Sequence, residues 1–346
     1  MQRLLAQLEA KRDLTAEQAS HLFSLLVDQS TTDDQRVALL AALRDKGETA
    51  TEVAAFARAM RSAALDPGIG RDGRVIVDVV GTGGDGGNTV NISTTAALLA
   101  AAAANRRIRI VKHGNRAISS RSGASDVLTA LGLPAAMDPA RARTLLERTG
   151  FTYLHAPHYH PSVAAVANAR KQLGTRSIFN LLGPLSNPAR PTAGLIGAYS
   201  PRAAELMANA MVELGFTSAV VVHTETGPDK GLDEATTALP YTEWLVRPSG
   251  VTQRRVNLGP SPCRIEGLRG GDAAQNAEVI RDLFRGRQHA ARKTVLLNAG
   301  LALWTGGVAG DSAECTRIAE GALLDGRAAN LLAELESFGR ESAHAA

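Results

Sequence analysis

Apolar positions in the first part of the chain recur every three or four residues, which is the spacing of amphipathic helices. Leu22, Leu25 and Leu26 form one such stripe. In three places a Thr is followed three residues later by Glu or Gln, which is the capping box of a helix N-terminus. These pairs are Thr15 with Gln18, Thr32 with Gln35, and Thr49 with Glu52. We therefore predict three helices in a small helical domain over residues 1–66.

The pattern changes near residue 75, where short β-rich runs begin to alternate with helical segments. The runs are Val75–Val80, Ile108–Val111, Thr152–Leu154, Ala193–Tyr199 and Ala219–Val222. Such alternation predicts an α/β fold with a mainly parallel central sheet and a ligand crevice at the carboxyl ends of its strands. We assign residues 67–346 to this large domain. A helical segment at about 161–190 interrupts the alternation, and we expect it to return to the small domain.

Two of the predicted strands end in segments suited to phosphate. Val75–Val80 runs into Gly81–Gly87, where five glycines in seven residues leave the backbone free to approach a ligand. Ile108–Val111 runs into Lys112–Arg116, which supplies two cations. Because neighbouring parallel strands end at one edge of a sheet, both segments face the same crevice. They predict a site for a polyphosphate.

Two common phosphate motifs fit less well. Gly81, Gly83 and Gly86 satisfy GxGxxG, but a dinucleotide site also needs an acidic residue at the end of the second strand. Here that strand ends in Lys112 and His113. A P-loop is excluded because no Gly-Lys-Ser or Gly-Lys-Thr follows the glycines.

Hydroxyl groups follow both loops. Ser93 and Thr94 precede a helix predicted over Thr95–Ala104, and Ser119, Ser120 and Ser122 precede another that begins near Ser125. Each of these residues has an ordinary explanation as a helix cap. A helix N-terminus with free amides is also an anion site, so both interpretations remain open.

Three further groups carry candidate chemistry. Asp233 and Glu234 follow a glycine-rich loop. Adjacent carboxylates usually lie at the surface in contact with solvent. At a strand end that faces a phosphate, however, they would suit Mg2+. Arg170 is either an ordinary exposed cation or the partner of a substrate carboxylate. The histidines of the third group, His155, His158 and His160, suggest zinc, but they surround two prolines and lack a further ligand. A loop that shapes an aromatic substrate pocket explains them better.

Bulk composition narrows the class of protein. With 45% hydrophobic residues, no apolar run of membrane length and no visible signal peptide, we expect a cytoplasmic enzyme with no membrane contact. Cys263 and Cys315 lack disulfide or metal spacing and are expected to be buried thiols. The net charge of +4 is not gathered into a run, so nucleic acid binding is not favoured.

Five motifs in this order resemble the anthranilate phosphoribosyltransferase family of tryptophan biosynthesis. They are GTGGDGGNTVNIST, KHGNRAISSRSG, APHYHP, ARKQLGTRSIFNLLGPLSNP and GLDE, which together extend over nearly the whole chain. The resemblance implies a homodimer with the nucleoside phosphorylase type of fold. It also implies 5-phosphoribosyl diphosphate, anthranilate and Mg2+ in the cleft.

The resemblance also assigns roles by motif position. The residues that would hold the diphosphate substrate are Gly81, Gly84, Asp85, Thr89, Asn91, Ser93, Thr94, Lys112, Ser119 and Ser120. Ser93, Asp233 and Glu234 would serve the metal. Gly81, Asn115 and Arg170 would contact anthranilate, with His113 shaping the pocket. We expect Lys112, Asn115 and Arg170 to be the catalytic residues.

The chain departs from the family at a few positions. Ala124 stands where the family has a serine that contacts diphosphate, and Tyr159 replaces the first histidine of a His-His pair. These changes bear on the acceptor more than on phosphoribosyl chemistry. The alternatives are a paralogue with another aromatic amine acceptor, a pyrimidine nucleoside phosphorylase, and a non-catalytic nucleic-acid-binding member of the fold.

Overall fold

The computed structural model describes residues 1–346 except 71, 118–120, 135, 229, 261–262 and 345–346. Its N-terminal part contains the helices α1 (Gln2–Glu9), α2 (Ala16–Val27), α3 (Asp33–Lys46) and α4 (Ala50–Ser62). The prediction of three helices was therefore wrong by one. Helix α1 has no side-chain cap, so the capping pattern carried no signal for it, although it buries Leu4 and Leu8.

The three predicted capping boxes are confirmed. Thr15, Thr32 and Thr49 each accept a hydrogen bond from the backbone amide three residues later. The side chain of that later residue accepts a bond from the threonine amide in return. Because these contacts are local in the chain, the sequence spacing was enough to locate the helix starts.

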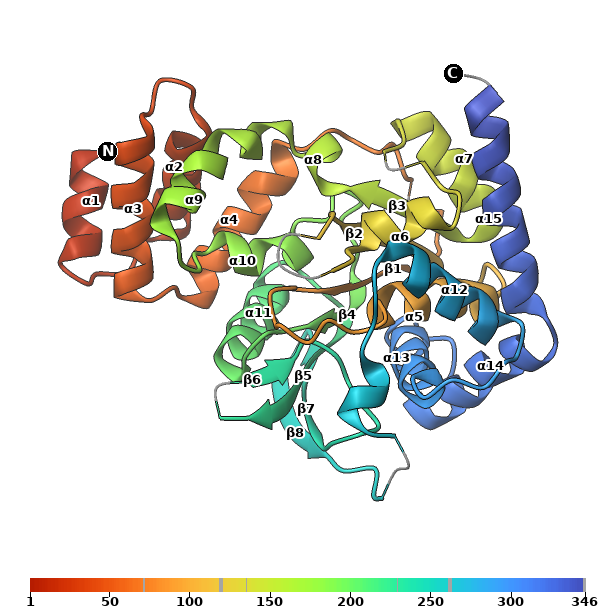
Figure 1. Ribbon diagram of the computed structural model, residues 1–346. Coiled ribbons are helices and arrows are strands. Elements are labelled where there is room, and N and C mark those ends of the chain that lie inside the picture. The colour runs from red at the N-terminus through yellow and green to blue at the C-terminus, as the bar shows by residue number, and fades with distance from the viewer. Residues whose placement is uncertain (71, 118–120, 135, 229, 261–262, 345–346) are drawn as a thin grey trace.

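A single sheet crosses the second part of the molecule (Figure 1). Its strands are β1 (Ile76–Gly81), β2 (Arg109–Gly114), β3 (Phe151–His155), β4 (Ala193–Gly197), β5 (Ser218–Gly227), β6 (Lys230–Leu232), β7 (Tyr241–Arg247) and β8 (Gly250–Val256). The order is β3-β2-β1-β4-β5-β7-β8, with β6 paired to β5. Strands β1 to β5 pair in parallel. The mainly parallel sheet of the predicted α/β fold is thus confirmed, whereas the antiparallel strands β6, β7 and β8 were not predicted.

The remaining helices cover the sheet and join its strands. They are α5 (Ile92–Ala104), α6 (Ala124–Ala130), α7 (Pro139–Thr149), α8 (Ala156–Tyr159), α9 (Ala167–Leu173), α10 (Phe179–Leu182), α11 (Pro201–Glu213), α12 (Ala273–Phe284), α13 (Arg292–Thr305), α14 (Ser312–Leu324) and α15 (Arg327–His344). Short 3-10 turns occupy Pro161–Val166, Gly183–Leu185 and Ile265–Leu268. Helix α5 packs against α13, α14 and α15 on one side of the sheet, and α11 packs on β5 and β7.

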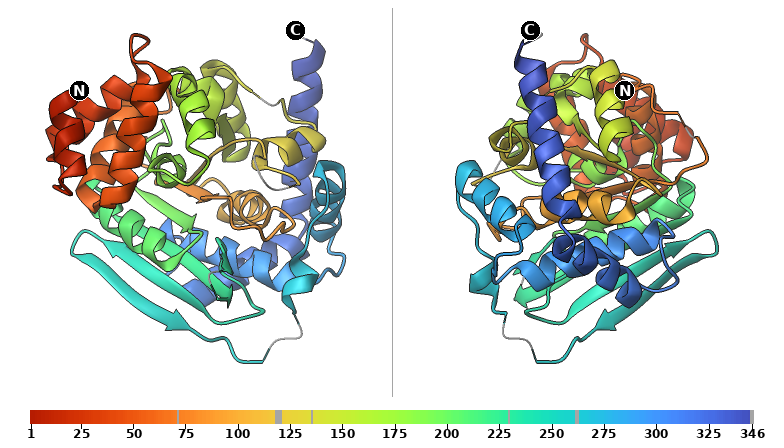
Figure 2. Two further views of the ribbon diagram at one scale, coloured as in Figure 1. Left: turned by 60° about the vertical axis from the view of Figure 1, so that its left-hand side comes forward. Right: turned by 90° about the vertical axis from the view of Figure 1, so that its right-hand side faces the viewer.

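The segment between β3 and β4 runs back to the N-terminal helices (Figures 1 and 2). Helix α9 contacts α3, α10 contacts α4, and the turn Pro161–Val166 contacts α2. These helices share one apolar cluster with α11 and part of the sheet, while α5 lies at the centre of a second cluster. The division of the chain into domains at residue 66 stays a prediction.

Candidate active site

The glycine loop leaves β1 beside the end of β2, as parallel neighbours require. Gly83, Gly84 and Gly86 have φ values of 66°, 69° and 75°, a region that residues with a Cβ atom rarely enter. The loop therefore needs glycine at these positions to turn back toward the start of α5.

Asp233 lies in the space that two glycines leave open. A Cβ atom on Gly81 would lie 2.3 Å from Oδ2 of Asp233, and one on Gly197 would lie 1.6 Å from its carbonyl oxygen. Oδ2 of Asp233 accepts a hydrogen bond from the amide of Gly83 at 2.7 Å. Asp85 accepts bonds from the amides of Asp233 at 3.3 Å and Gly87 at 3.0 Å. The glycine loop and the acid pair are thus one hydrogen-bonded unit.

Glu234 reaches the first turn of α5. Its Oε1 atom accepts a hydrogen bond from the amide of Ser93 at 3.2 Å. The capping interpretation of Ser93 and Thr94 was wrong, because α5 begins at Ile92 and its N-cap residue is Asn91, which makes no side-chain cap. The backbone amide of Ser93, which was expected to be free to bind an anion, instead donates to the carboxylate of Glu234.

Asp233 and Glu234 are buried, and their negative charges repel each other. Burial, followed by the charge of Asp85, raises the pKa of Asp233 to about 7. Burial, followed by the charge of Asp233, raises the pKa of Glu234 well above its ordinary value. Mg2+ binds one or two protein carboxylates and completes its shell with water and phosphate. Two buried carboxylates that lack a salt-bridge partner among the described residues therefore fit this ion.

Lys112 is buried, and the charges of Asp78, Glu234 and Asp233 act on it. Its Nζ donates to the carbonyl of Val79 at 2.5 Å. Burial lowers the pKa of Lys112, while the charge of Asp78 opposes that shift. Asp78 also accepts bonds from the amide of His113 at 3.2 Å and from Nδ2 of Asn187 at 2.9 Å, and burial raises its pKa to about 6. Asp78 and Asn187 were absent from the predicted site.

His113 is a neutral side chain in this network. Its Nδ1 lies 3.1 Å from the carbonyl oxygen of Gly183, which only accepts hydrogen bonds, so Nδ1 carries the proton. Its Nε2 is buried with no hydrogen-bond partner among the described residues. Burial, with the neighbouring His160 ring at 5.1 Å, lowers the pKa of His113 to about 3. A group this acidic is a poor general base near neutral pH.

Arg170 occupies α9, on the side of the N-terminal helices. Its guanidinium lies 5.4 Å from the centre of the Phe179 ring. Burial lowers its pKa, and no carboxylate pairs with it among the residues that the structure describes. The interpretation as an ordinary exposed cation was wrong, because the side chain is half-buried. An unpaired, partly desolvated guanidinium suits a planar carboxylate.

Arg176 was missed, although it stands in the same sequence motif as Arg170. It donates to the carbonyl of Gly84 at 2.8 Å and stacks on the ring of Tyr199 at 3.9 Å. It therefore links the α9–α10 segment to the glycine loop. Its position in that motif was the only feature of the sequence that could have indicated a role for Arg176.

The segment after β2, which we predicted to bind phosphate, is only partly covered by the described residues. Ser119 and Ser120 lie outside the described residues. Asn115 is exposed, and its Oδ1 accepts a bond from the amide of Arg116 at 2.7 Å. The N-cap of α6 is Gly123, so the capping interpretation of Ser122 was wrong.

Thr89 and Asn91 hold the far end of the glycine loop. Thr89 bridges to Arg269, and the side chain of Asn91 contacts the carbonyl of Ser122 at 3.1 Å and Nδ2 of Asn276 at 2.7 Å. These bonds tie the loop to three separate segments. They fix its position before any ligand arrives.

The histidine loop shows no metal-ligand set. No group of three His, Cys, Asp or Glu suited to a metal occurs in the described part of the chain. Tyr159 is buried, and its hydroxyl donates to the carbonyl of Met137 at 3.0 Å. This tyrosine therefore stabilises the fold of the loop from within.

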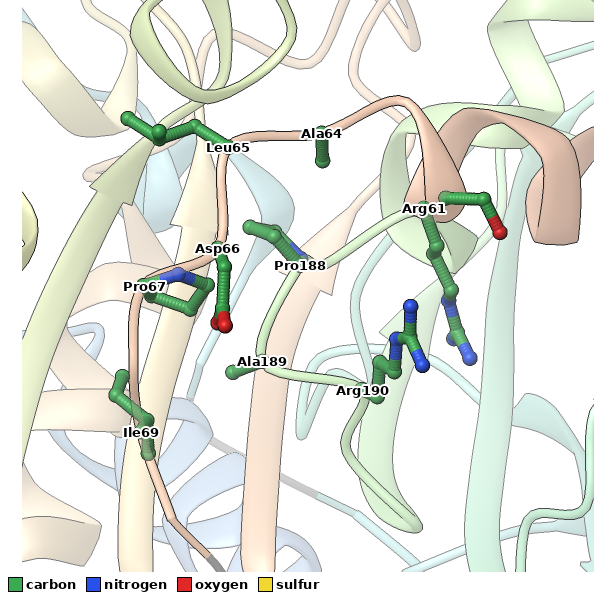
Figure 3. Close-up of a pocket in the computed structure, with 10 residues that line it drawn as sticks. Arg61, Ala64, Leu65, Asp66, Pro67, Ile69, Pro188, Ala189 and Arg190 are labelled. Carbon is green, nitrogen blue, oxygen red and sulfur yellow. The ribbon is translucent and has the colours of Figure 1, made fainter.

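The described residues enclose cavities of similar size at two places. One of about 580 Å3 is lined by the linker after α4 and by Pro188, Ala189 and Arg190, with the side chains of Arg61 and Arg190 directed to one side of it (Figure 3). The other, of about 590 Å3, lies against the glycine loop.

No helix among the described residues is long and apolar enough to cross a membrane.

Comparison with known proteins bears on the whole chain. The family model "Glycosyl transferase family, helical bundle domain" matches residues 2–64, and "Glycosyl transferase family, a/b domain" matches residues 73–329. The anthranilate phosphoribosyltransferase of Desulforudis audaxviator is 40% identical over 343 residues, 98% of this chain and 96% of the relative. The chain belongs to the anthranilate phosphoribosyltransferase family.

Other members of the anthranilate phosphoribosyltransferase family agree. The Methylocella silvestris protein is 40% identical over 97% of this chain and 94% of its own. The Thermus thermophilus crystal structure has a TM-score of 0.86 at 35% identity and covers 97% of this chain and 99% of that one. A Saccharomyces cerevisiae structure in complex with PRPP and Mg shares the fold with a TM-score of 0.79 at 24% identity over 94% and 92%.

Proposed function

We propose that this chain transfers the phosphoribosyl group of 5-phosphoribosyl diphosphate to the amine of anthranilate. One observation carries the proposal: a buried acid pair is hydrogen-bonded to a glycine loop, and that loop is linked through Arg176 to the segment that carries the unpaired Arg170. The first part suits a metal-bound diphosphate, and the second suits a carboxylate. The membership of the family supports the same reaction.

The reaction forms a bond between the amine nitrogen and C1 of the ribose and breaks the bond from C1 to the diphosphate oxygen. The electron pair leaves with diphosphate, and the amine loses a proton to water. An aryl amine is neutral at pH 7, so catalysis rests on positioning and on stabilising the leaving group. This chemistry agrees with a neutral His113 of low pKa, which we assign to shaping the pocket.

Mg2+, when bound, would neutralise charge on the departing diphosphate. We propose that Asp233, Glu234 and Ser93 hold it, which agrees with the two raised carboxylate pKa values. Lys112 would add a positive charge that the neighbouring acids Asp78, Glu234 and Asp233 favour. The remaining residues that we assign to the diphosphate substrate are Gly81, Gly84, Asp85, Thr89, Asn91, Thr94, Ser119 and Ser120.

For the acceptor we propose that Arg170 anchors the carboxylate and that Asn115 orients the amine, with Gly81 in contact with the ring. We further propose a homodimer and closure of the cleft about the segments near Pro67 and 183–191. Small-angle scattering with and without both substrates tests closure. Identical profiles would count against it.

The deciding assay is the loss of anthranilate fluorescence on addition of 5-phosphoribosyl diphosphate and Mg2+. Metal-dependent loss is the expected result. If fluorescence persists while calorimetry shows that the diphosphate substrate binds, the acceptor is a different aromatic amine. Phosphorolysis of a pyrimidine nucleoside would instead indicate the phosphorylase branch.

A further inference from the structure

The cavity against the glycine loop, of about 590 Å3, is lined by cations that the reaction does not use. Gly86, Gly87 and Asn88 form one wall, and Arg121, Lys230 and Arg269 project from other segments. All three basic residues are exposed. Neither Asp233 nor Glu234 lines this cavity.

These three cations have no counter-ion within the part of the chain that the structure describes. Among the described residues, none of their side chains forms a salt bridge or a hydrogen bond. Asp85 is the single acid among the described lining residues, and its oxygens already accept the amides of Gly87 and Asp233. Like charges that face one cavity repel each other, and a concave surface of one sign attracts ions of the other.

Three separate segments are fixed against the same loop. The amide of Arg121 donates to Oδ1 of Asn88 at 3.2 Å. Arg269 bridges to Thr89 next along the loop. Lys230 lies on β6 with Leu232, whose Cδ2 would be 2.2 Å from a Cβ atom on Gly87. These contacts hold the segments that carry the cations around the cavity before any ligand binds, which lowers the cost of binding.

We propose that this cavity is a second anion site, which binds a diphosphate group without a metal ion. Arginine side chains form paired hydrogen bonds with phosphate, and lysine adds a point charge. The volume lies in the range of small-ligand sites. The choice of diphosphate rests on the proposed function, because that reaction both consumes and releases this group. The site would hold it next to Asp85, one hydrogen bond away from the acid pair.

The test is calorimetric titration of the full-length protein with inorganic diphosphate, in the presence of a chelator that removes Mg2+. A cavity variant, Arg121→Gln with Lys230→Gln and Arg269→Gln, is compared with a control that removes the same charge elsewhere. The control changes exposed cations that lie outside the cavity: Arg3→Gln, Lys293→Gln and Arg317→Gln. Circular dichroism and thermal denaturation check folding, and Lys230→Gln alone serves if the triple cavity variant does not fold.

We expect the cavity variant to bind inorganic diphosphate about tenfold or more weakly than the wild type, and the control to stay within about twofold. Equal affinity in the cavity variant and the control overturns the proposal. A parallel titration with 5-phosphoribosyl diphosphate separates the sources. Weakening for inorganic diphosphate alone assigns the cavity to released product, and weakening for both ligands extends it to the substrate.

This result is independent of the acceptor. If anthranilate fluorescence does not fall in the deciding assay but the cavity variant still loses diphosphate binding, the proposed function fails and the anion site stands. If turnover is normal and diphosphate binding is unchanged, the anion site fails and the proposed function stands.

Discussion

The two parts of the proposed site are built differently. The diphosphate side, defined as Gly81–Gly87 with Asp233 and Glu234, is held by backbone amides that donate to buried carboxylates. The acceptor side is defined as His113, Asn115 and Arg170. Among the residues that the structure describes, Nε2 of His113 has no hydrogen-bond partner and the guanidinium of Arg170 pairs with no carboxylate. The amides of the first side are therefore bonded before substrate binds, although its two acids have no salt-bridge partner among the described residues. Under the proposed function, the second side gains its hydrogen bonds from anthranilate.

The largest expected effect comes from the diphosphate side. Asp233→Asn keeps the shape of the residue but removes a charge that the metal requires, so kcat/KM should fall by about 100- to 1,000-fold. Steady-state kinetics over a range of Mg2+ concentrations measure it. Glu225→Gln removes an exposed acid from β5 and is the control. Activity near the wild-type level in Asp233→Asn would show that the acid pair does not serve the metal.

On the acceptor side, Arg170→Ala should raise the KM for anthranilate by about 10- to 100-fold, because a hydrogen-bonded charge is lost. The KM for the diphosphate substrate should change little. Lys171→Ala removes the neighbouring exposed cation of the same helix and is the matched control. Equal increases in both Michaelis constants would contradict the assignment and remove the difference between the two sides.

His113, on the acceptor side, should make the free energy of unfolding depend on pH. Its folded pKa of about 3 is below the ordinary value of 6.5, so the unfolded chain binds the proton more tightly. The contribution to stability is complete above pH 6.5 and is lost as the pH falls toward 3. By pH 5 the loss amounts to about 2 kcal/mol.

Urea unfolding at pH 7.5 and pH 5 measures this contribution. His113→Gln should show a smaller decrease in stability than the wild type, and the exposed His21→Gln should behave as the wild type does. A decrease of the same size in His113→Gln would mean that other groups, such as His160 with its pKa of about 4, account for acid sensitivity.

The smallest effect is expected where the two sides meet. Arg176→Ala removes an exposed bond to the carbonyl of Gly84 and the stacking on Tyr199, which together contribute about 1 kcal/mol. The KM for the diphosphate substrate should rise about threefold to fivefold. Arg12→Ala, which removes an exposed cation of the N-terminal part, is the control. An unchanged KM would mean that the glycine loop holds its shape without this contact.

Features that depend on neighbours in the chain were predictable, and those that depend on distant residues were not. The capping boxes of Thr15, Thr32 and Thr49 follow from spacing alone. Asp78 and Asn187 meet across 109 positions, and no local pattern marks that contact. Strands β7 and β8 were missed because the expectation of parallel alternation left no place for an antiparallel hairpin at the edge.

The candidate site shows the same limit. Motif order predicted that the glycine loop and the acid pair belong to one phosphate site, and the structure shows that the two are hydrogen-bonded to each other. It did not reveal that Glu234 takes the amide of Ser93, because that bond joins residues 141 positions apart. The capping interpretation used the correct rule for Ser93 but placed the start of the helix too late.

The packing of helix α5 limits which substitutions the proposed site tolerates. All of its residues except Ser93 are buried, and most of them are alanines packed between β1, β2 and the helices α13 to α15. A methyl group fills each of these alanine positions, so a larger side chain would push the helix along or away from the sheet. Ser93 and the contact to Glu234 would move with it. Substitutions in α5, which lies behind the proposed site, are therefore constrained as tightly as substitutions within the site. In a saturation mutagenesis library, almost no larger side chain should be tolerated at the alanine positions of α5.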